Sequence, residues 1–576
     1  MSGSPKAFAL HSADYVIFLS FMSISVGVGA YYAIVNRRRM SKVQEEGTSK
    51  TDEYLMGGRN MPFIPITLSL LTTFLSGKSL LGIPAEMFDH GLWMFVYMPM
   101  SIIAFLVSGL VFVPIFYHLK MTSIYEYLEL RFHSTTLKKL CAAVFILNTL
   151  VYMGGVVYGP AVALSSVTDM PTFWTIIVGL AFLFLMLVQL VGCSSTLYTT
   201  IGGLKAVVWT DTLQAGVMFA GMLAVMVKGT VDVGGFHKIF EVAVDSGRYE
   251  EMWRLDPNPA QYANMWTSTF GAIAVWLSFY GVNQMTVQRY CSVPTLKEAK
   301  KVIMLSAPLY LLLTMMVCFI GLLVLTFFYN CNPLETGEIS TYDQLVVLFA
   351  ARVAENYPGF PGLLLACIFA ATLSTVSTGY NSMAAVIYND YVRPSFGEKR
   401  ALLINKTLVF FSGVLSTLIA FSVQPLGGIV RSSVAILGAT RGPVVGLFFL
   451  GVFARNVSTR ATVVSFVGSI GVCLFLWICS VLENPYKDYH MPTNSSLEGC
   501  HGRSFNITYL PPYDASYGRP DTFFFSRISP FMYAFFGLVF VFFPALILSY
   551  CIPPQAEQYS SGRKHSLTWN GRKIKC

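Results

Sequence analysis

The sequence predicts an all-α membrane protein with about thirteen transmembrane helices. Of its 576 residues, 54% are hydrophobic and only 12% are charged, whereas a soluble globular domain has about 25% charged residues. Mean hydropathy is +0.59. Apolar stretches of about 20 residues, long enough to cross a bilayer, recur along the whole chain and leave no separate soluble domain.

Each expected helix is an apolar stretch between polar loops. The stretches lie near residues 15–35, 64–88, 92–116, 140–165, 172–197, 205–228, 264–282, 302–328, 361–388, 402–423, 427–453, 460–482 and 530–552.

The loops between the expected helices predict the orientation of the chain. Lys and Arg gather at 37–59 after the first helix, at 120–139 after the third and at 563–575 in the tail. Because basic loops stay in the cytoplasm, these positions predict an extracellular N-terminus, a cytoplasmic C-terminus and a multi-pass protein of the plasma membrane. The net charge of +9 is therefore attributed to topology, and nucleic acid is not expected as a partner.

Glycosylation sequons give an independent test of this orientation. Asn494 and Asn506 each begin an Asn-X-Ser/Thr sequence in the long loop before the last helix, which the topology places outside. Both are expected to carry glycans. Asn456 also begins a sequon, but its loop would be cytoplasmic, so it is expected to stay unmodified.

Cysteine and histidine give no sign of a metal or catalytic centre. The eleven cysteines are scattered without a CxxC pair, and the eight histidines show no pairing, so a zinc site or an enzyme is not expected. Cys331 and Cys500 both fall in expected extracellular loops, where a disulfide between them could persist. An ion channel is disfavoured as well, because no ring-forming filter motif is evident.

Two expected helices carry interruptions that a lipid-facing helix would not tolerate. The second has Ser76-Gly-Lys-Ser79 in its middle and Pro84 beyond, and the seventh ends in Tyr280-Gly-Val-Asn-Gln284. Backbone at such breaks lines cavities. The two helices are five apart and so run in opposite directions, as the first helices of two inverted five-helix repeats would. The alternative is that Gly and Ser merely allow close helix packing.

The ninth expected helix has a dense run of hydroxyl side chains over 372–378. Sodium is a hard cation that prefers several oxygen ligands, and backbone carbonyls at a helix break together with Ser and Thr hydroxyls from a neighbouring helix would supply them. The same hydroxyls could instead bind the carbonyls of their own helix four residues back. The residues alone leave both interpretations open.

At these positions the chain resembles the sodium/solute symporter family over nearly its whole length, and most closely the animal branch of iodide, monocarboxylate and multivitamin transporters. The motifs that carry the resemblance are Tyr54-Leu-Met-Gly-Gly-Arg59, Thr122-Ser-Ile-Tyr-Glu-Tyr-Leu-Glu-Leu-Arg131, Tyr198-Thr-Thr-Ile-Gly-Gly-Leu-Lys-Ala-Val-Val-Trp-Thr-Asp211, Tyr280-Gly-Val-Asn-Gln-Met-Thr-Val-Gln-Arg-Tyr290 and Thr372-Leu-Ser-Thr-Val-Ser-Thr378. The resemblance implies a LeuT-like core of ten helices, with one helix before it and two after.

The resemblance also implies roles for individual residues. The sodium site would use the carbonyls of Thr72, Leu75 and Ala371 and the hydroxyls of Ser374 and Thr375. Asp211 matches a carboxylate in the cation path, with Gln214 one turn further on. Gln214, Tyr152 and Gln284 match polar cavity positions of the iodide-transporter branch. Together with the residues of the two helix breaks, the expected substrate residues are Ser76, Lys78, Ser79, Tyr152, Tyr280 and Gln284. For Asp211, the alternative is a structural pair with Lys205 or with a nearby arginine.

Lys78 departs from the family pattern, because the animal branch has a small apolar residue at this position. Ser79 likewise stands where sugar and iodide transporters carry larger polar groups. A lysine at a broken transmembrane helix is costly and needs compensation. It could line the cavity and supply a positive charge, either to an anionic substrate or in place of a second sodium ion. It could instead reach an interface or pair with a carboxylate.

The expected function is sodium-coupled import of a small organic anion, such as a monocarboxylate or a vitamin, or of iodide, by alternating access. The alternatives are a sodium-coupled sugar or polyol symporter and a non-transporting sensor with the same fold. The basic tail is expected to contact membrane lipid, and a homodimer is left open. The expected organisation is an extracellular N-terminus, first helix and basic loop (1–60), a first repeat (61–228), an extracellular loop (229–263), a second repeat (264–455), two C-terminal helices with the glycosylated loop (456–552) and a basic cytoplasmic tail (553–576).

Overall fold

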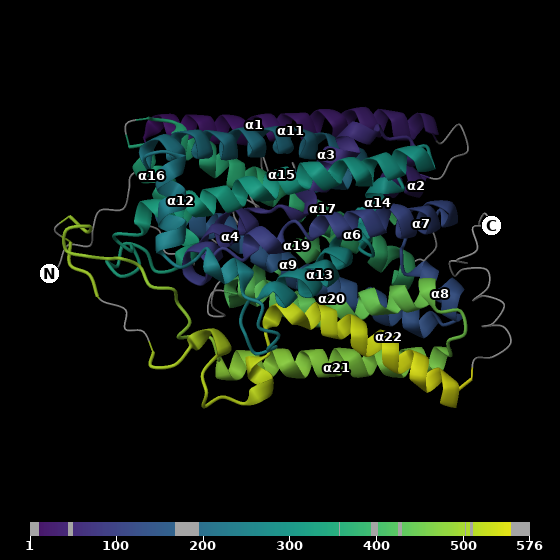
Figure 1. Cartoon of the computed structure of the whole chain (residues 1–576). Helices are drawn as coiled ribbons and strands as arrows, with labels where there is room; N and C mark the ends of the chain where they lie inside the picture. The colour runs from purple at the N-terminus through teal and green to yellow at the C-terminus, as the bar shows by residue number, and fades with distance from the viewer. Residues whose placement is uncertain are drawn as a thin grey trace.

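The computed structural model describes residues 11–43, 50–167, 195–355, 357–392, 401–423, 429–501, 503–506 and 511–553. Within these ranges all regular structure is helical and no β-strand occurs. The helices lie roughly side by side along one direction, as Figure 1 shows. The expectation of an all-α protein is therefore confirmed.

The helices fall into two groups by length. The long ones are α1 (Ser12–Val43), α9 (Thr135–Val167), α11 (Ser195–Asp232), α15 (Leu296–Phe328), α17 (Phe360–Ile387), α19 (Ala401–Val423), α20 (Ile429–Phe453), α21 (Thr459–Glu483) and α22 (Tyr533–Cys551). The shorter ones are α2 (Lys50–Met56), α3 (Phe63–Phe74), α4 (Gly77–His90), α5 (Met94–Tyr97), α6 (Ser101–Val107), α7 (Val113–Leu119), α8 (Glu126–Phe132), α12 (Phe236–Asp245), α13 (Ala272–Tyr280), α14 (Gln284–Tyr290) and α16 (Leu345–Val353).

Single turns of other helix types join or extend these helices. The 3₁₀ turns are η1 (Gly57–Arg59), η3 (Glu250–Trp253), η5 (Tyr342–Gln344), η8 (Ala515–Tyr517), η9 (Phe524–Arg527) and η10 (Pro530–Met532), and the π turns are η2 (Ser108–Phe112), η4 (Thr267–Gly271) and η6 (Tyr388–Val392).

Ten described helical spans are long and apolar enough to cross a membrane, and an eleventh is formed if the bent pair α3 and α4 counts as one. The expected span 264–282 is the shorter run of η4 and α13, which ends at a break before α14. Nearly all of the span expected at 172–197 lies outside the described residues. The number thirteen therefore stays a prediction.

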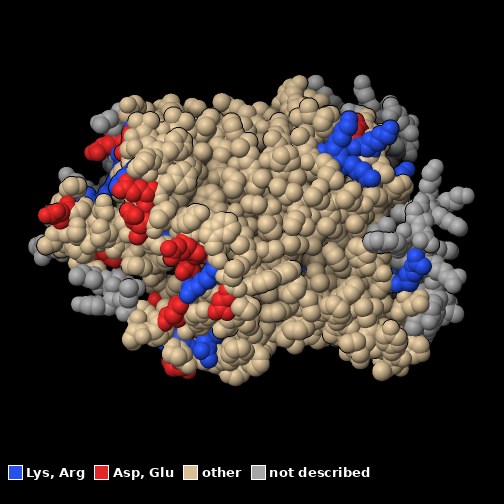
Figure 2. All heavy atoms as spheres, viewed as in Figure 1, with Lys and Arg blue, Asp and Glu red and all other residues tan. Residues whose placement is uncertain are grey.

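The outer surface has the character of a membrane protein. Large apolar side chains point outward from several helical segments, with Leu110 of η2 at 65%, Phe411 of α19 at 62% and Val464 of α21 at 58% exposure. Figure 2 shows charged side chains gathered near the two ends of the molecule and almost none on the broad band between them. This distribution is the one that a bilayer requires.

Helix α1 packs against α11 and α17 and is fixed to the start of α17. The Asp14 carboxylate accepts hydrogen bonds from the backbone N–H of Gly359 at 2.9 Å and of Gly362 at 3.0 Å. These are N–H groups at a helix N-terminus, which have no partner inside the helix. Gly362 also has no room for a side chain, because a Cβ there would lie 2.3 Å from the carbonyl oxygen of Asp14.

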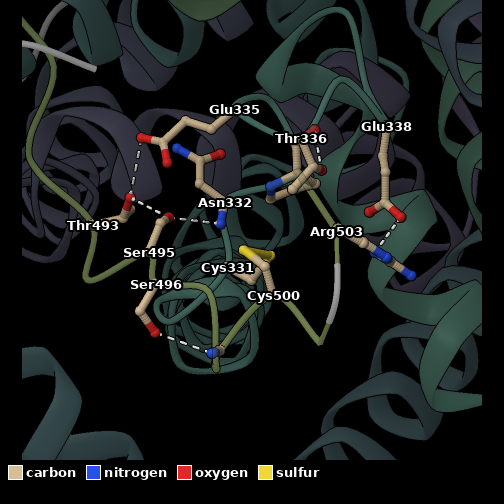
Figure 3. Close-up of a disulfide and its surroundings, with 12 residues drawn as sticks. Cys331, Asn332, Glu335, Thr336, Glu338, Thr493, Ser495, Ser496, Cys500 and Arg503 are labelled. Carbon is tan, nitrogen blue, oxygen red and sulfur yellow. Dashed lines mark hydrogen bonds and ion pairs between the residues drawn. A yellow bond between two sulfur atoms is a disulfide. The ribbon is translucent and has the colours of Figure 1, made fainter. Parts of the chain in front are cut away.

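One end of the molecule, here called the loop end, is formed by the segments 329–344 and 484–529 and lies at the left of Figure 1. The other end, at the right, carries α2 and α8 and is called the α8 end. At the loop end the structure joins Cys331 and Cys500 in a disulfide, with Cα atoms 4.9 Å apart (Figure 3). The long loop is thereby held beside the end of α15.

The guanidinium of Arg248 fastens the long loop to the end of α4. It is fully buried and donates to the carbonyl oxygens of Phe88 at 2.8 Å, Pro492 at 3.0 Å and Met491 at 3.1 Å. Burial lowers the pKa of Arg248 to about 10, so the group remains charged at neutral pH. The outer end of α4 is therefore tied to a segment about 400 residues away in the chain.

Candidate functional site

The second transmembrane segment is broken in the middle of the protein. Helix α3 ends at Phe74, α4 begins at Gly77, and the two helices are bent by 51°. Leu75 and Ser76, both fully buried, have non-helical dihedral angles between them. Carbonyl groups in the last turn of α3 are consequently left without a helical partner.

Glycine at position 77 lets the break approach α17. A Cβ atom on Gly77 would lie 2.6 Å from the hydroxyl oxygen of Thr372 and 3.0 Å from the carbonyl oxygen of Ile368. Any larger residue would push α4 away from α17. The Ser-Gly-Lys-Ser sequence thus produces both the break and the close approach.

Four oxygen atoms of α3 and α17 converge beside this break. The hydroxyls of Ser374 and Thr375 lie 3.0 and 3.1 Å from the carbonyl oxygen of Thr72. Each hydroxyl also lies 3.0 Å from the carbonyl oxygen of Ala371. All four residues are fully buried.

This arrangement shows the hydrogen bonds of one interpretation and is compatible with the other, in which the same oxygens bind sodium. The hydroxyls do bind a carbonyl of their own helix, and they bind the orphan carbonyl of Thr72 as well. Neutral carbonyl and hydroxyl oxygens are the ligand type that a hard monovalent cation needs. Hydroxyl oxygens retain lone pairs for a cation when their hydrogens rotate away.

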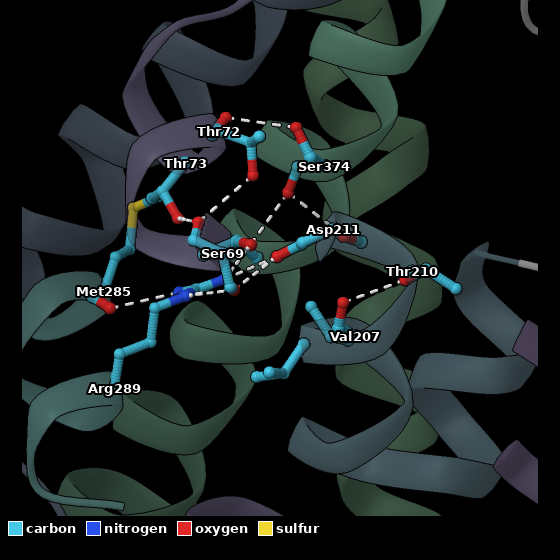
Figure 4. A network of polar contacts seen from close by, with 12 residues as sticks. Ser69, Thr72, Thr73, Val207, Thr210, Asp211, Met285, Arg289 and Ser374 are labelled. Atoms are coloured by element: carbon cyan, nitrogen blue, oxygen red, sulfur yellow. Dashed lines mark hydrogen bonds and ion pairs between the residues drawn. The ribbon is translucent and has the colours of Figure 1, made fainter. Parts of the chain in front are cut away.

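A buried ion pair between α11 and α14 lies beside Ser69, one turn before Thr72 on α3. The Arg289 guanidinium contacts the Asp211 carboxylate at 3.1 Å, and the Ser69 hydroxyl donates to the same carboxylate oxygen at 2.6 Å (Figure 4). Arg289 also donates to the Ser69 hydroxyl at 2.8 Å and to the Thr378 hydroxyl. These contacts join α3, α11, α14 and α17 in one network.

Only one carboxylate oxygen of Asp211 takes part in these contacts. The second oxygen of Asp211, Oδ1, is buried without a hydrogen-bond partner among the described residues, and so is the side-chain amide of Gln214 on the next turn of α11. Of the two alternatives for Asp211, the structure has the nearby arginine, because Lys205 contacts Glu53 instead. Oδ1 therefore keeps unused acceptor capacity within the described part of the chain.

A cavity with about 70 Å³ of water-accessible space adjoins the break. Its lining includes Lys78, Ser79, Tyr152, Trp276, Phe279 and Tyr310. The walls are mostly apolar and include several aromatic rings, and the Tyr152 hydroxyl lies 3.4 Å from the carbonyl oxygen of Phe74 at the end of α3. A molecule held here would contact the broken helix directly.

Lys78 brings a positive charge into this cavity. Its side chain is 8% exposed, and its ammonium lies 5.0 Å from the centre of the Tyr152 ring, within the range of a cation–π contact. Among the described residues it makes no direct ion pair, and the nearest acid that acts on its charge is Asp343, at a longer distance. In the structure Lys78 therefore lines the cavity, rather than reaching the surface or pairing with an acid.

Three other expected substrate residues lie around the cavity without lining it. Ser76 is buried at the break, and Tyr280 stacks on Phe105 with ring centres 3.9 Å apart. Gln284 is turned toward the α8 end, where its amide binds the backbone of Ile124 at 2.9 Å and of Thr122 at 2.7 Å. In this conformation Gln284 fixes the segment before α8.

Arg441 is a charged residue of this region that the sequence analysis did not single out. It lies on α20, one turn beyond the cavity residues Leu437 and Gly438. The signal was present in the sequence, because an arginine in the middle of an apolar span is a functional candidate by default. Interrupted helices marked the other candidate residues, and α20 is unbroken.

Comparison with known proteins places the chain among transporters. A model described as the sodium:solute symporter family matches residues 54–468. The human sodium-coupled monocarboxylate transporter 2 is 33% identical over 539 residues, which cover 93% of this chain and 83% of that protein. The rabbit (Oryctolagus cuniculus) sodium-dependent multivitamin transporter is 34% identical, covering 82% and 71%, and the human sodium/iodide cotransporter is 32% identical, covering 86% and 74%.

A solved structure shares the fold. It is a substrate-bound, outward-open state of a Na⁺-coupled sialic acid symporter, with a TM-score of 0.71 and 21% sequence identity over 94% of this chain and 99% of that one. At this identity the likeness concerns the fold alone. It confirms the LeuT-like architecture that the motifs led us to expect.

Proposed function

Because this chain belongs to the sodium:solute symporter family, we propose that it imports a small organic anion or iodide together with sodium across the plasma membrane. It is a multi-pass membrane protein and not an enzyme. The family accounts for sodium-coupled transport. The anionic character of the solute is the proposal.

The observation that carries the proposal is the position of Lys78. A cation that lines an apolar cavity with aromatic walls and makes no direct ion pair among the described residues, with the Asp343 charge acting on it only from a longer distance, is complementary to a carboxylate or a halide. A neutral sugar or polyol would leave this charge uncompensated in a buried place. Monocarboxylate, vitamin and iodide transporters among the relatives support an anion as well.

The sodium ion is proposed to bind between the break and α17. Its ligands would be the carbonyls of Thr72, Leu75 and Ala371 and the hydroxyls of Ser374 and Thr375. Without the ion, the two hydroxyls satisfy the carbonyls of Thr72 and Ala371. With the ion, the broken segment would be fixed against α17 in the conformation that accepts substrate.

Coupling then follows from shared structure. The α3 side of the break provides sodium ligands, and Lys78 and Ser79 on the α4 side line the cavity. Sodium and substrate therefore stabilise the same arrangement of one broken helix, and each raises the affinity for the other by the same factor. A membrane potential adds about 2.3 kcal/mol per charge per 100 mV to the driving force.

Asp211 and Gln214 are proposed to lie on the path by which the cation leaves. Oδ1 of Asp211 and the side-chain oxygen of Gln214 are buried without a partner among the described residues, and Asp211 contacts Ser69, one turn before the proposed sodium ligand Thr72 on α3. The ion pair with Arg289 holds the Asp211 carboxylate in place while Oδ1 faces the path. Asp211 would thus serve the cation path in addition to its ion pair with Arg289.

The loop end is proposed to be extracellular and the α8 end cytoplasmic, with residues 61–228 and 264–455 as the two repeats. The exposed side chains of Asn494 and Asn506 and the disulfide at the loop end support this orientation. The proposed partners are sodium, an anionic solute and membrane lipid, with a homodimer left open.

Substrate-dependent current separates the candidate functions. Cells that express the chain are clamped at negative potential and superfused with lactate, biotin, iodide, glucose and myo-inositol, first in sodium and then in choline medium. We expect inward current with one or more anions in sodium only. Current with a neutral solute alone would favour the sugar or polyol symporter. A chain that reaches the surface and accumulates no radiolabelled solute would be a sensor.

A further inference from the structure

Arg441 is a buried arginine near the cavity, and its guanidinium has no hydrogen-bond acceptor among the described residues. Its side chain is 7% exposed and its Nη1 atom has no hydrogen-bond partner. Its Cζ atom lies 4.5 Å from the centre of the Phe279 ring and 5.3 Å from that of Tyr152. Both rings belong to the wall of the cavity.

The other deeply buried arginines of the described chain each have an acid or carbonyl oxygens as partners. Arg289 pairs with Asp211, Arg248 donates to three carbonyl oxygens, and Arg131 donates to the carbonyl oxygens of Gly451 and Ala454. A buried cation with only aromatic neighbours is poorly compensated, because cation–π contacts replace little of its lost hydration. The described residues therefore leave the Arg441 charge without a counter-charge, which a bound anion could supply.

The position of Arg441 indicates which anion this is. Arg441 and Lys78 both contact the ring of Tyr152, and their charges are near enough to repel each other. Helix α20 runs from the cavity toward the α8 end, where the carbonyl of Gly451 binds Arg131. Arg441 thus lies between the cavity and the α8 end, and Phe279 and Tyr152 separate it from the cavity.

The rotation of α20 is fixed next to Arg441. The hydroxyl of Thr440 donates to the side-chain oxygen of Asn148, which lies one turn before Tyr152 on α9. This contact keeps the guanidinium against the aromatic wall. The guanidinium of Arg441 therefore keeps its position without an ion pair to any described acid.

We propose that Arg441 forms an inner anion site, which receives the negatively charged group of the substrate from Lys78 when the Phe279 and Tyr152 rings part. This inference rests on the proposed import of an anion. Lys78 would set the affinity at the loop end, and Arg441 the affinity at the α8 end. The anion would then pass from one fixed positive charge to the next.

The test measures substrate affinity separately from the two faces. Full-length protein is reconstituted in proteoliposomes, and radiolabelled lactate and iodide are supplied to one face at a time under a fixed sodium gradient. We expect Arg441→Gln to raise the half-saturating concentration at least tenfold at the α8 face and less than twofold at the loop face. Arg441→Lys should keep most of the affinity, and Lys78→Gln should show the opposite asymmetry.

Thermal unfolding of the same samples separates this role from a structural one. Removal of an uncompensated buried charge should leave the unfolding temperature of Arg441→Gln unchanged or higher. A lower unfolding temperature with equal loss of affinity at both faces would overturn the inner site, and so would unchanged affinity at the α8 face. Failure of the wild-type protein to transport either anion would instead overturn the proposed function itself.

Discussion

The hydroxyl of Ser374 lies 3.0 Å from the carbonyl oxygen of Thr72, across the contact between the unbroken α17 and the end of α3. One partner is a side chain on a continuous helix, and the other is a backbone group released by a helix break. Replacement of both Ser374 and Thr375 by alanine should raise the sodium concentration for half-maximal uptake about tenfold or more, as expected for the loss of hydrogen-bonding groups to a charge. Uptake measured over a range of sodium concentrations gives this half-maximal value.

Ser377→Ala is the matched control for this pair. Its hydroxyl is buried on the same helix and binds only the carbonyl of Ser374, at 3.1 Å. The sodium dependence of this variant should stay close to that of the wild type. Full uptake with unaltered sodium dependence in the double variant would show that the cation binds elsewhere.

Asp211→Asn should lower the free energy of unfolding by about 3–5 kcal/mol, because it leaves the buried guanidinium of Arg289 without its counter-charge. A second change, Arg289→Met, should restore part of the loss, since no unpaired charge then remains. Thermal unfolding of purified protein measures both. Strictly additive losses would contradict a direct pairing of the two side chains.

Lys78→Met should raise the half-saturating concentration of the transported anion about tenfold or more and should alter the charge moved per substrate. Simultaneous measurement of current and radiolabelled uptake gives both quantities. The exposed Lys301→Met serves as control for the loss of one positive charge. Unchanged affinity together with an unchanged charge moved per substrate would show that Lys78 has no role in transport.

His490 makes the attachment of the long loop sensitive to pH. Burial opposes its charge, but the hydrogen bond from the ring to Asp89 at 2.7 Å and the negative charge of Asp89 outweigh burial and raise the pKa of His490. The contact should therefore stabilise the protein fully below the ordinary histidine pKa of about 6.5 and lose this effect as the pH rises through the higher folded value.

Comparison with His490→Gln measures this contribution. The difference in unfolding temperature between wild type and variant should be largest in mild acid and shrink toward alkaline pH. His90, whose ring lies 6.2 Å away, is the other titratable neighbour on α4, so His90→Gln is included. A difference that grows with pH would contradict the assignment.

Glycan attachment tests the orientation. Asn494→Gln and Asn506→Gln should each lower the apparent mass of protein made in animal cells by one glycan, whereas Asn456→Gln should change nothing. Digestion with a glycosidase that removes N-linked glycans should bring all variants to one mass. A glycan on Asn456 would place the α8 end outside.

Much of the architecture could be predicted because membrane solvation constrains a sequence strongly. Apolar length marked the helices, and the Gly and Ser residues around Lys78 marked the break that the structure has between Phe74 and Gly77. The hydroxyl run on the ninth helix was expected beside this break. The structure brings Ser374 and Thr375 to Thr72 as the resemblance implied.

The partners of long polar side chains could not be predicted in the same way. An amide such as Gln284 can serve a cavity or a backbone segment equally well, and only the packing of α14 against the segment before α8 decides. The choice between Lys205 and Arg289 as partner of Asp211 depends on helix contacts that no local pattern encodes. Arg441 lies inside an otherwise apolar span. The span was therefore recognised as a transmembrane helix, and its single arginine was not considered as a site residue.

The bond between Cys331 and Cys500 encloses a stretch of chain with a sequence separation of 169, including α17, α19, α20 and α21. A protease that cuts inside this ring, for example between two of its helices, would not release either fragment. The nicked protein would migrate as a single species until a reductant is added, and only then would two bands separate. Integrity of the polypeptide must therefore be judged on reducing gels.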